Sequence, residues 1–172
     1  ESELFEICRP SGFEGMVAHF PLDANTNDSS GNANHGTNNG AVPTEDRFGS
    51  PNSAYSFDGN SYIHLNLQNG NMLDTSNTGA KTTVAFWMKW DGTDNMIVYG
   101  WYDFALWFYN GYFGFNSSNS DIYSIPSASF INNWVHVVAE FTNNSPYENE
   151  LYINGVLQNL AMQNSYPLNV TI

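Results

Sequence analysis

Basic residues, cysteine and long apolar runs are all scarce in this 172-residue chain. Four Lys and Arg residues stand against 17 Asp and Glu residues, which gives a formal net charge of −13 at pH 7. Nucleic acids and anionic membrane surfaces are bound by clustered Lys and Arg, so the composition argues against both as partners. No apolar run reaches the length of a membrane span. Because acidic, Lys-poor surfaces are common among secreted and cell-surface proteins, we expect an extracellular or cell-surface location.

The single cysteine, Cys8, cannot form an internal disulfide, so cysteine pairing says nothing about the compartment. Two interpretations stay open: a disulfide to a segment outside this chain, or a buried thiol. The structure of residues 1–15 also stays open, because they fit either an edge strand ("LFEIC") or a linker from an upstream domain.

Helical periodicity is absent, and short alternating apolar and polar runs are separated by clusters of Asn, Gly, Ser, Asp and Pro. This pattern predicts an all-β fold built as a two-sheet antiparallel sandwich. The two Asn-rich segments, 24–40 and 66–79, are predicted loops. The predicted strands lie near 16–22, 54–58, 61–67, 82–90, 96–101, 104–109, 112–116, 121–125, 134–142, 150–154 and 156–160.

Asn110-Gly111, between two alternating runs, predicts a β-hairpin with a two-residue type I′ turn, because both residues tolerate the positive φ of that turn. A two-residue turn fixes the register of the flanking strands. Phe104, Leu106, Phe108, Phe113 and Phe115 then form an apolar face that is predicted to join the core. The opposite face is formed by Ala105, Trp107, Tyr109, Tyr112, Gly114 and Asn116.

Aromatic and amide-bearing residues therefore gather outside the predicted core. Aromatic rings stack on the apolar C–H faces of sugars, and Asp and Asn hydrogen-bond the hydroxyl groups. A sugar- or peptide-binding face, a second apolar layer beneath a loop such as 66–79, and a subunit interface all fit this pattern. The candidate ligand-binding residues are Trp101, Tyr102, Asp103, Trp107, Tyr109, Tyr112 and Asn116.

Five segments resemble the signature blocks of laminin-G-like, concanavalin-A-like lectin-glucanase jelly-roll domains. They are "MVAHFPLDANTNDSSGNANHGT" (16–37), "AYSFDGNSYIHL" (54–65), "TVAFWMKWDG" (83–92), "WVHVVAEF" (134–141) and "LYINGVL" (151–157). The resemblance implies one jelly-roll domain over residues 16–172. It also implies a further strand after "YPLNVTI" (166–172), which would pair beside the first strand. We expect either that the chain has been cut at this point or that a second polypeptide supplies that strand, unless the N-terminal "LFEIC" run covers the edge.

The loop "NTNDSSGNANHG" (25–36) concentrates side-chain oxygens, which are the ligands that Ca²⁺ prefers. A polar turn held by Asx motifs explains the same residues without a metal. In the family that the chain resembles, this loop commonly holds a structural calcium. The resemblance implies that the ligands here are Asp28, Asn32, Asn34 and His35.

Catalytic motifs are absent from the sequence: there is no nucleophile elbow, zinc motif or phosphate loop. The carboxylates predicted on strands, such as Glu140, look isolated, whereas glycosidases need two together. The sequence therefore predicts a non-enzymatic carbohydrate-binding or adhesion module with a structural calcium. The alternative is a structural or assembly domain that binds a partner protein through an open sheet edge.

Overall fold

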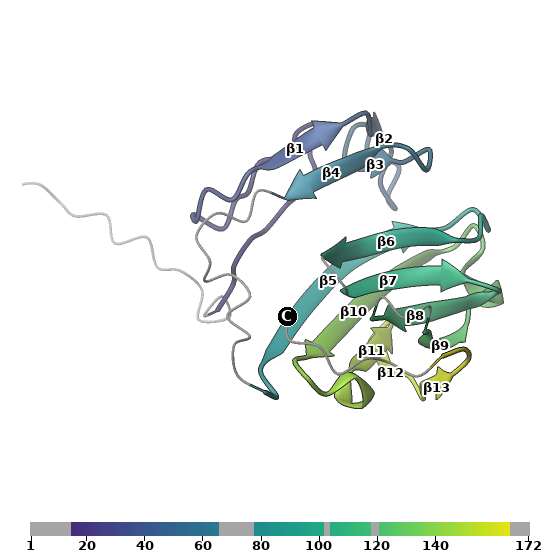
Figure 1. Ribbon diagram of the computed structural model, residues 1–172. Coiled ribbons are helices and arrows are strands. Elements are labelled where there is room, and N and C mark those ends of the chain that lie inside the picture. Colours follow the sequence, from purple (N-terminus) through teal and green to yellow (C-terminus); the bar gives the residue numbers. More distant parts are fainter. Residues whose placement is uncertain (1–14, 66–77, 102–103, 118–120, 166–172) are drawn as a thin grey trace, which may run out of the picture. The chain divides into compact units, whose positions relative to one another are not determined.

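The computed structural model describes residues 15–65, 78–101, 104–117 and 121–165 (Figure 1). The chain divides into two compact units, residues 1–72 (unit 1) and residues 73–172 (unit 2). Both units are built from antiparallel strands, and helix in the described ranges is limited to two 3₁₀ turns, η1 (Ala128–Phe130) and η2 (Pro146–Glu148). The predicted all-β class is therefore confirmed. Cys8 lies outside the described residues.

Unit 1 contains two small sheets. Strand β1 (Gly36–Asn39) pairs with β4 (Tyr62–Leu65), and β2 (Val42–Thr44) pairs with β3 (Ala54–Ser56). Strands β3 and β4 lie where the sequence predicted strands. The loop predicted over 24–40 is wrong at its end, because residues 36–39 form β1 against β4 despite their Asn-rich composition. The strand predicted over 16–22 is also wrong, since these residues have no strand structure.

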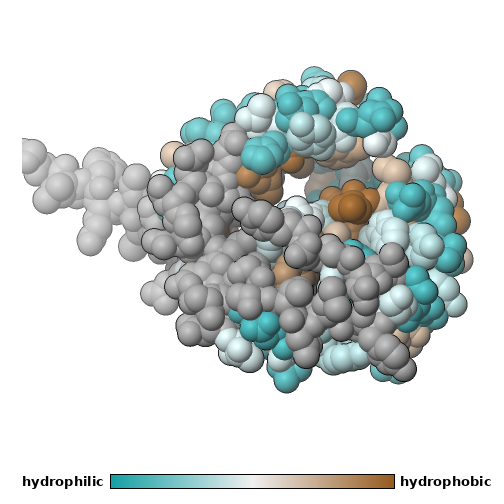
Figure 2. Space-filling model, viewed as in Figure 1, coloured by the Kyte–Doolittle hydropathy of each residue, from teal (hydrophilic) through white to brown (hydrophobic). Residues whose placement is uncertain are grey.

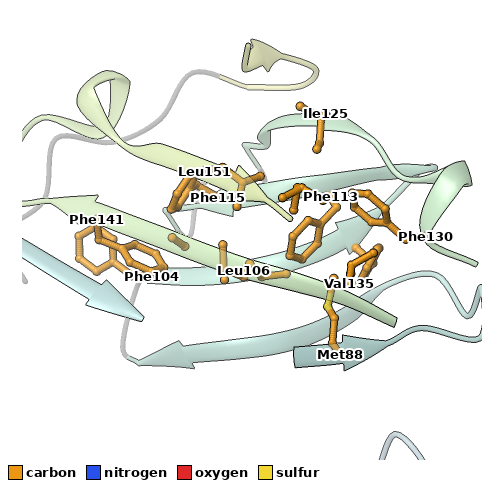
Figure 3. Packing of buried hydrophobic residues seen from close by; sticks show 14 residues of the cluster. Met88, Phe104, Leu106, Phe113, Phe115, Ile125, Phe130, Val135, Phe141 and Leu151 are labelled. Carbon is orange, nitrogen blue, oxygen red and sulfur yellow. The ribbon is translucent and has the colours of Figure 1, made fainter. Parts of the chain in front are cut away.

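Unit 2 contains two larger sheets with one core between them (Figures 1 and 3). The four-stranded sheet has the order β12-β11-β10-β5, and the five-stranded sheet has the order β13-β9-β8-β7-β6. The strands are β5 (Lys81–Lys89), β6 (Met96–Trp101), β7 (Phe104–Tyr109), β8 (Tyr112–Asn116), β9 (Tyr123–Pro126), β10 (Trp134–Thr142), β11 (Glu150–Ile153), β12 (Val156–Leu157) and β13 (Ala161–Met162). All except β13 lie close to predicted strands.

The core of unit 2 consists of aromatic and aliphatic side chains, and in the four-stranded sheet more buried residues alternate with less buried ones along β5 and most of β10, as a two-sheet arrangement requires. On β10, Val135, Val137, Ala139 and Phe141 are buried while the residues between them are half-buried. Figure 3 shows Phe104 and Phe141 together at one end of the cluster, and Phe113 and Phe130 at the other. Each fully buried ring contributes about 1.5–3 kcal/mol to folding relative to an exposed one.

The predicted hairpin is confirmed residue by residue. Leu106 pairs with Phe115, Phe108 with Phe113, and Tyr109 with Tyr112. Asn110 and Gly111 have φ values of 51° and 78°, the positive values that a type I′ turn needs at both positions. This register determines which side of the five-stranded sheet each aromatic residue occupies.

Surface chemistry agrees with the composition. On the face shown in Figure 2, hydrophilic and intermediate residues prevail, and hydrophobic colour is confined to small patches. No helix in the part of the chain that the structure describes is long and apolar enough to cross a bilayer.

Candidate functional site

The outer face of the five-stranded sheet carries three half-buried aromatic residues: Trp107 and Tyr109 on β7 and Tyr112 on β8. We call these residues the aromatic trio. The neighbours that alternate with them, Leu106, Phe108 and Phe113, are completely buried on the other side of the sheet. The trio therefore lies outside the core of unit 2, as the hairpin register predicted.

The rings of the trio are arranged in a specific way. Trp107 and Tyr109 stack with their centroids 4.2 Å apart and an interplanar angle of 21°. Tyr112 lies directly across from Tyr109 on the neighbouring strand. Stacking uses one face of each of the two rings, so a ligand can contact only their opposite faces and their edges.

Strand β6 adds apolar residues that sequence analysis missed. Ile97 pairs with Trp107, so it lies on the same side of the sheet, and it is 65% exposed. Val98 follows at a register shift between Ile97 and Tyr99 and is also exposed. The run "MIVY" has no clear alternation because of this bulge, which explains why its exposed residues could not be assigned to a face from the sequence.

Small residues lie beside the trio on this face. Trp107 pairs with Gly114, which has no side chain, and Gly114 pairs in turn with Ser124 on β9. A Cβ atom on Gly114 would lie 2.2 Å from the carbonyl oxygen of Tyr123 and 2.5 Å from the Cα of Ser124. Glycine is therefore required at this buried position because strand β9 approaches the backbone closely.

The other candidate ligand-binding residues are placed differently. Trp101 was predicted in the ligand-binding cluster, but its ring packs on the core against Phe141, with centroids 4.6 Å apart, and against Phe104. The reason is the register of β6, in which Trp101 pairs with the core residue Phe104. Tyr102 and Asp103 lie outside the described residues. Asn116, at the end of β8, donates its amide to the backbone carbonyl of Asp121 at 2.8 Å.

In unit 1, the loop of residues 25–36 is organised around the carboxylate of Asp28, which is only 7% exposed. Oδ1 accepts hydrogen bonds from the backbone N–H groups of His19 and Ser30, at 2.9 and 2.8 Å. Oδ2 accepts the Ser30 hydroxyl at 2.8 Å and the Asn34 backbone N–H at 2.9 Å. Each oxygen thus receives two donors, and the bond from the Ser30 N–H to Oδ1 closes an Asx-type turn.

These hydrogen bonds change the acidity of Asp28. Burial on its own would raise the pKa of the carboxyl group, but the backbone N–H groups of His19, Ser30 and Asn34 and the Ser30 hydroxyl lower it to about 2. Hydrogen bonds donated to a carboxylate favour its charged form. Asp28 is consequently held as an anion inside a ring of donors.

The remaining predicted metal ligands also contact the backbone. Asn32 donates its amide to the carbonyls of Met16 and Val17 at 3.1 and 2.9 Å, and Asn34 donates to Val17 at 3.0 Å. His35 accepts the N–H of Asp28 through Nδ1 at 3.1 Å. The bonds from Asn32 and Asn34 occupy the carbonyls of Met16 and Val17, which compete with strand pairing by that segment.

The four predicted calcium ligands therefore lie in one loop. The described residues contain no group of three or more His, Cys, Asp or Glu side chains arranged for a metal. Calcium at this loop stays a prediction, and the hydrogen bonds of Asp28 give the loop a structural explanation that needs no ion.

Two carboxylates of the four-stranded sheet are closer together than the sequence suggested. Glu140, expected to be isolated, pairs directly with Glu150 across β10 and β11. The Glu140 carboxylate binds the Lys81 ammonium group and raises the pKa of Lys81. Glu150 accepts the Tyr152 hydroxyl at 2.7 Å, which raises the pKa of Tyr152. Glu150 begins the strand predicted over 150–154, but only the strand pairing reveals that it lies opposite Glu140.

Comparisons with known proteins gave no match: no family model, no curated protein and no solved structure is significantly similar to this chain.

Proposed function

We propose that this chain is a non-catalytic carbohydrate-binding module that works outside the cell or at its surface. The observation that carries the proposal is the position of the aromatic trio on the outer face of the five-stranded sheet, while the alternating residues Leu106, Phe108 and Phe113 supply the core. Aromatic side chains that the core does not need are available to a ligand.

The chemistry of the trio suits a sugar. Trp and Tyr combine a large apolar surface with a polar tip, and a sugar ring presents apolar C–H groups together with hydroxyl groups. With a net charge of −13, the protein repels anions, so neutral glycans are favoured over sulfated or sialylated ones.

The jelly-roll topology of the laminin-G-like family and a structural calcium at Asp28, Asn32, Asn34 and His35 form part of the same proposal. The motif blocks and the all-β architecture support the first. The second is supported by the clustering of these four residues in one loop. Addition of EDTA should lower the melting temperature if calcium is bound, and an unchanged melting temperature would remove calcium from the proposal.

The decisive experiment combines a glycan array with two matched tryptophan variants. Trp107→Ala should reduce the affinity for the bound glycan at least tenfold, because it removes the largest ring of the trio. The control is Trp87→Ala, which removes a 43% exposed tryptophan from the four-stranded sheet, where it lies 5.1 Å from His136. Equal binding by the wild type and both variants would refute the role of the trio.

Catalytic inactivity is tested in the same samples. Incubation with the polysaccharides that score on the array should release no reducing sugar. If sugar is released, the Glu140–Glu150 pair is the place to examine, because paired carboxylates are what glycoside hydrolysis requires.

A second candidate function is the binding of a partner protein by strand addition. Within the sheets of unit 2 as described, β5 ends the four-stranded sheet and β6 ends the five-stranded sheet. An edge strand offers unpaired N–H and C=O groups to an incoming strand. Native mass spectrometry distinguishes the candidates: a second polypeptide that co-purifies at a fixed ratio favours assembly, whereas a bare chain that binds glycan favours the lectin-like function.

A further inference from the structure

A separate pocket lies in unit 2 where three segments of the chain meet: the β5–β6 loop, the β7–β8 turn and η1 with its flanking residues. Its volume is about 280 Å³, just below the range of about 300–1,000 Å³ typical of small-molecule sites. It therefore suits a small ligand. The lining residues are Trp90, Gly92, Asp94, Gly111, Ser127, Ala128 and Ile131.

Hydrogen bonds between the three segments hold the pocket in shape. The N–H of Ser127 donates to the carbonyl of Gly111 at 3.0 Å, and the N–H of Asn132 donates to the carbonyl of Trp90 at 2.7 Å. The Trp90 indole N–H donates to the carbonyl of Thr93 at 2.7 Å, and its ring stacks on Phe108 with centroids 3.9 Å apart. Because its walls are fixed to one another, the pocket is formed before any ligand binds.

Among the described residues that line the pocket, Asp94 is the ionisable one. Its Oδ2 accepts the backbone N–H of Asn110 at 2.8 Å, which fixes the carboxylate against the hairpin turn. Within the described ranges, Oδ1 has no hydrogen-bond partner. A fixed carboxylate with one oxygen available is a preorganised acceptor for a positively charged or hydrogen-bond-donating ligand.

The rest of the lining decides between those two ligand types. Trp90, Ala128 and Ile131 make the walls mainly apolar, and Ser127 is only 1% exposed. A sugar ring carries several hydroxyl groups that each need a partner when buried, and this lining offers too few. An organic cation needs one negative charge and apolar contacts, and the lining residues in the described part of the chain include no Lys, Arg or His that would repel it.

We propose that this pocket binds a small organic cation of the alkylammonium class, with Asp94 as the counter-ion and Trp90 and Ile131 in contact with its methyl or methylene groups. The net charge of −13 raises the local concentration of cations around the whole protein and adds to the attraction. The site is distinct from the aromatic trio and does not depend on glycan binding.

The test is an NMR titration of the 172-residue chain with choline chloride, with sodium chloride added to the reference sample to match the ionic strength. Saturable shifts are expected at the amides of Gly92 and Gly111 and at the Trp90 indole, with a dissociation constant on the order of 1 mM. The Trp107 indole should not shift. The neutral isostere 3,3-dimethyl-1-butanol and methyl β-D-glucopyranoside should not bind at the same concentrations.

Matched aspartate variants identify the counter-ion. Asp94→Asn should weaken choline binding at least tenfold. Asp91→Asn changes the net charge equally, but Asp91 accepts the N–H of Thr93 and does not line the pocket, so binding should change less than twofold. If Asp94→Asn fails to fold, raising sodium chloride from 50 to 500 mM with the wild type tests the same charge dependence.

The source of the cation is distinguished by a parallel titration with Nα-acetyl-lysine methylamide. Tighter binding of this probe points to a lysine side chain of a partner protein, and tighter binding of choline points to a choline-bearing molecule. Equal binding of choline and its neutral isostere, an equal loss in the two aspartate variants, or the absence of shifts at 50 mM choline would each overturn the proposal.

Discussion

The described parts of the two units are stabilised by different interactions. In unit 2, a continuous cluster of buried aromatic and aliphatic side chains fills the space between two sheets (Figure 3). In unit 1, Ala41 is the single buried hydrophobic residue within 15–65, and the most buried side chains besides it are Asp28 and Asn34. Unit 2 is thus stabilised mainly by apolar burial, whereas the loop of unit 1 is held by directed hydrogen bonds.

The two units should therefore respond differently to the loss of side-chain volume and to a change of pH. Apolar packing is lost when volume is removed and depends little on pH. The stabilisation from a buried carboxylate with four donors is lost when its charge or its acceptor oxygens are removed, and this stabilisation depends on pH. The following predictions use that contrast, from the largest expected effect to the smallest.

Removal of a core ring from unit 2 should have the largest effect. Phe108 is completely buried, and its ring centroid lies 3.9 Å from that of Trp90 and 4.5 Å from that of Phe113. Phe108→Ala should lower the free energy of unfolding by about 3–5 kcal/mol. Urea denaturation followed by tryptophan fluorescence measures this, because all five tryptophans belong to unit 2.

The control for that variant is Phe48→Ala in unit 1, where the side chain is 74% exposed. A change within about 0.5 kcal/mol is expected for an exposed residue of this kind. Comparable losses in the two variants would contradict the assignment of the core to unit 2.

Removal of the Asp28 charge should destabilise the loop of unit 1 by a smaller amount. Asp28→Asn keeps the size of the side chain but replaces one acceptor oxygen with an NH₂ group. If that group takes the place of Oδ2, it faces two donors, the Ser30 hydroxyl and the Asn34 N–H. The free energy of unfolding should therefore fall by about 1–3 kcal/mol. Hydrogen exchange at the amides of His19, Ser30 and Asn34 should accelerate. Asp23→Asn, at an exposed position of the same unit, should leave these rates unchanged.

Acid should affect the same loop selectively. The pKa of Asp28 is about 2 in the folded state and 3.8 in an ordinary environment. Because the folded pKa is the lower one, the stabilisation is fully present above about pH 4 and is lost as the pH falls through about 2. Its size is about 1–2 kcal/mol after allowance for solvent screening. The protection factor of the Asn34 amide, which corrects for the intrinsic pH dependence of exchange, should therefore fall between pH 4 and pH 2 in the wild type. Asp28→Asn should lack this step.

Trp107→Ala should have the smallest effect on stability, although it removes a ring larger than that of Phe108. Its ring is half-buried on the outer face and loses mainly its stacking on Tyr109, so about 1 kcal/mol is expected. The pair Trp107→Ala and Phe108→Ala compares adjacent residues on opposite faces of one strand. A loss from Trp107→Ala as large as that from Phe108→Ala would show that the trio serves the core, and it would weaken the proposed glycan site.

Much of unit 2 could be predicted from the sequence because its signals are local. An alternating run predicted the strand over 134–142 that became β10, and Asn110-Gly111 fixed the hairpin register to the residue. In unit 1, the Asn-rich composition concealed β1, whose pairing with β4 is a contact between distant residues. Composition cannot show which distant segment satisfies a strand's hydrogen bonds.

By itself, the sequence determined the all-β class, the positions of most strands of unit 2 and the outer placement of Trp107, Tyr109 and Tyr112, because period-2 patterning and a two-residue turn act over a few neighbouring residues. Only the tertiary structure decided that Trp101 packs on the core and that Glu140 lies opposite Glu150. It also decided that the Asp28 carboxylate accepts four hydrogen bonds from His19, Ser30 and Asn34. The pocket at Asp94 belongs with these, since its walls come from three segments that only folding brings together. Such contacts depend on strand order and loop closure, which local pattern does not encode.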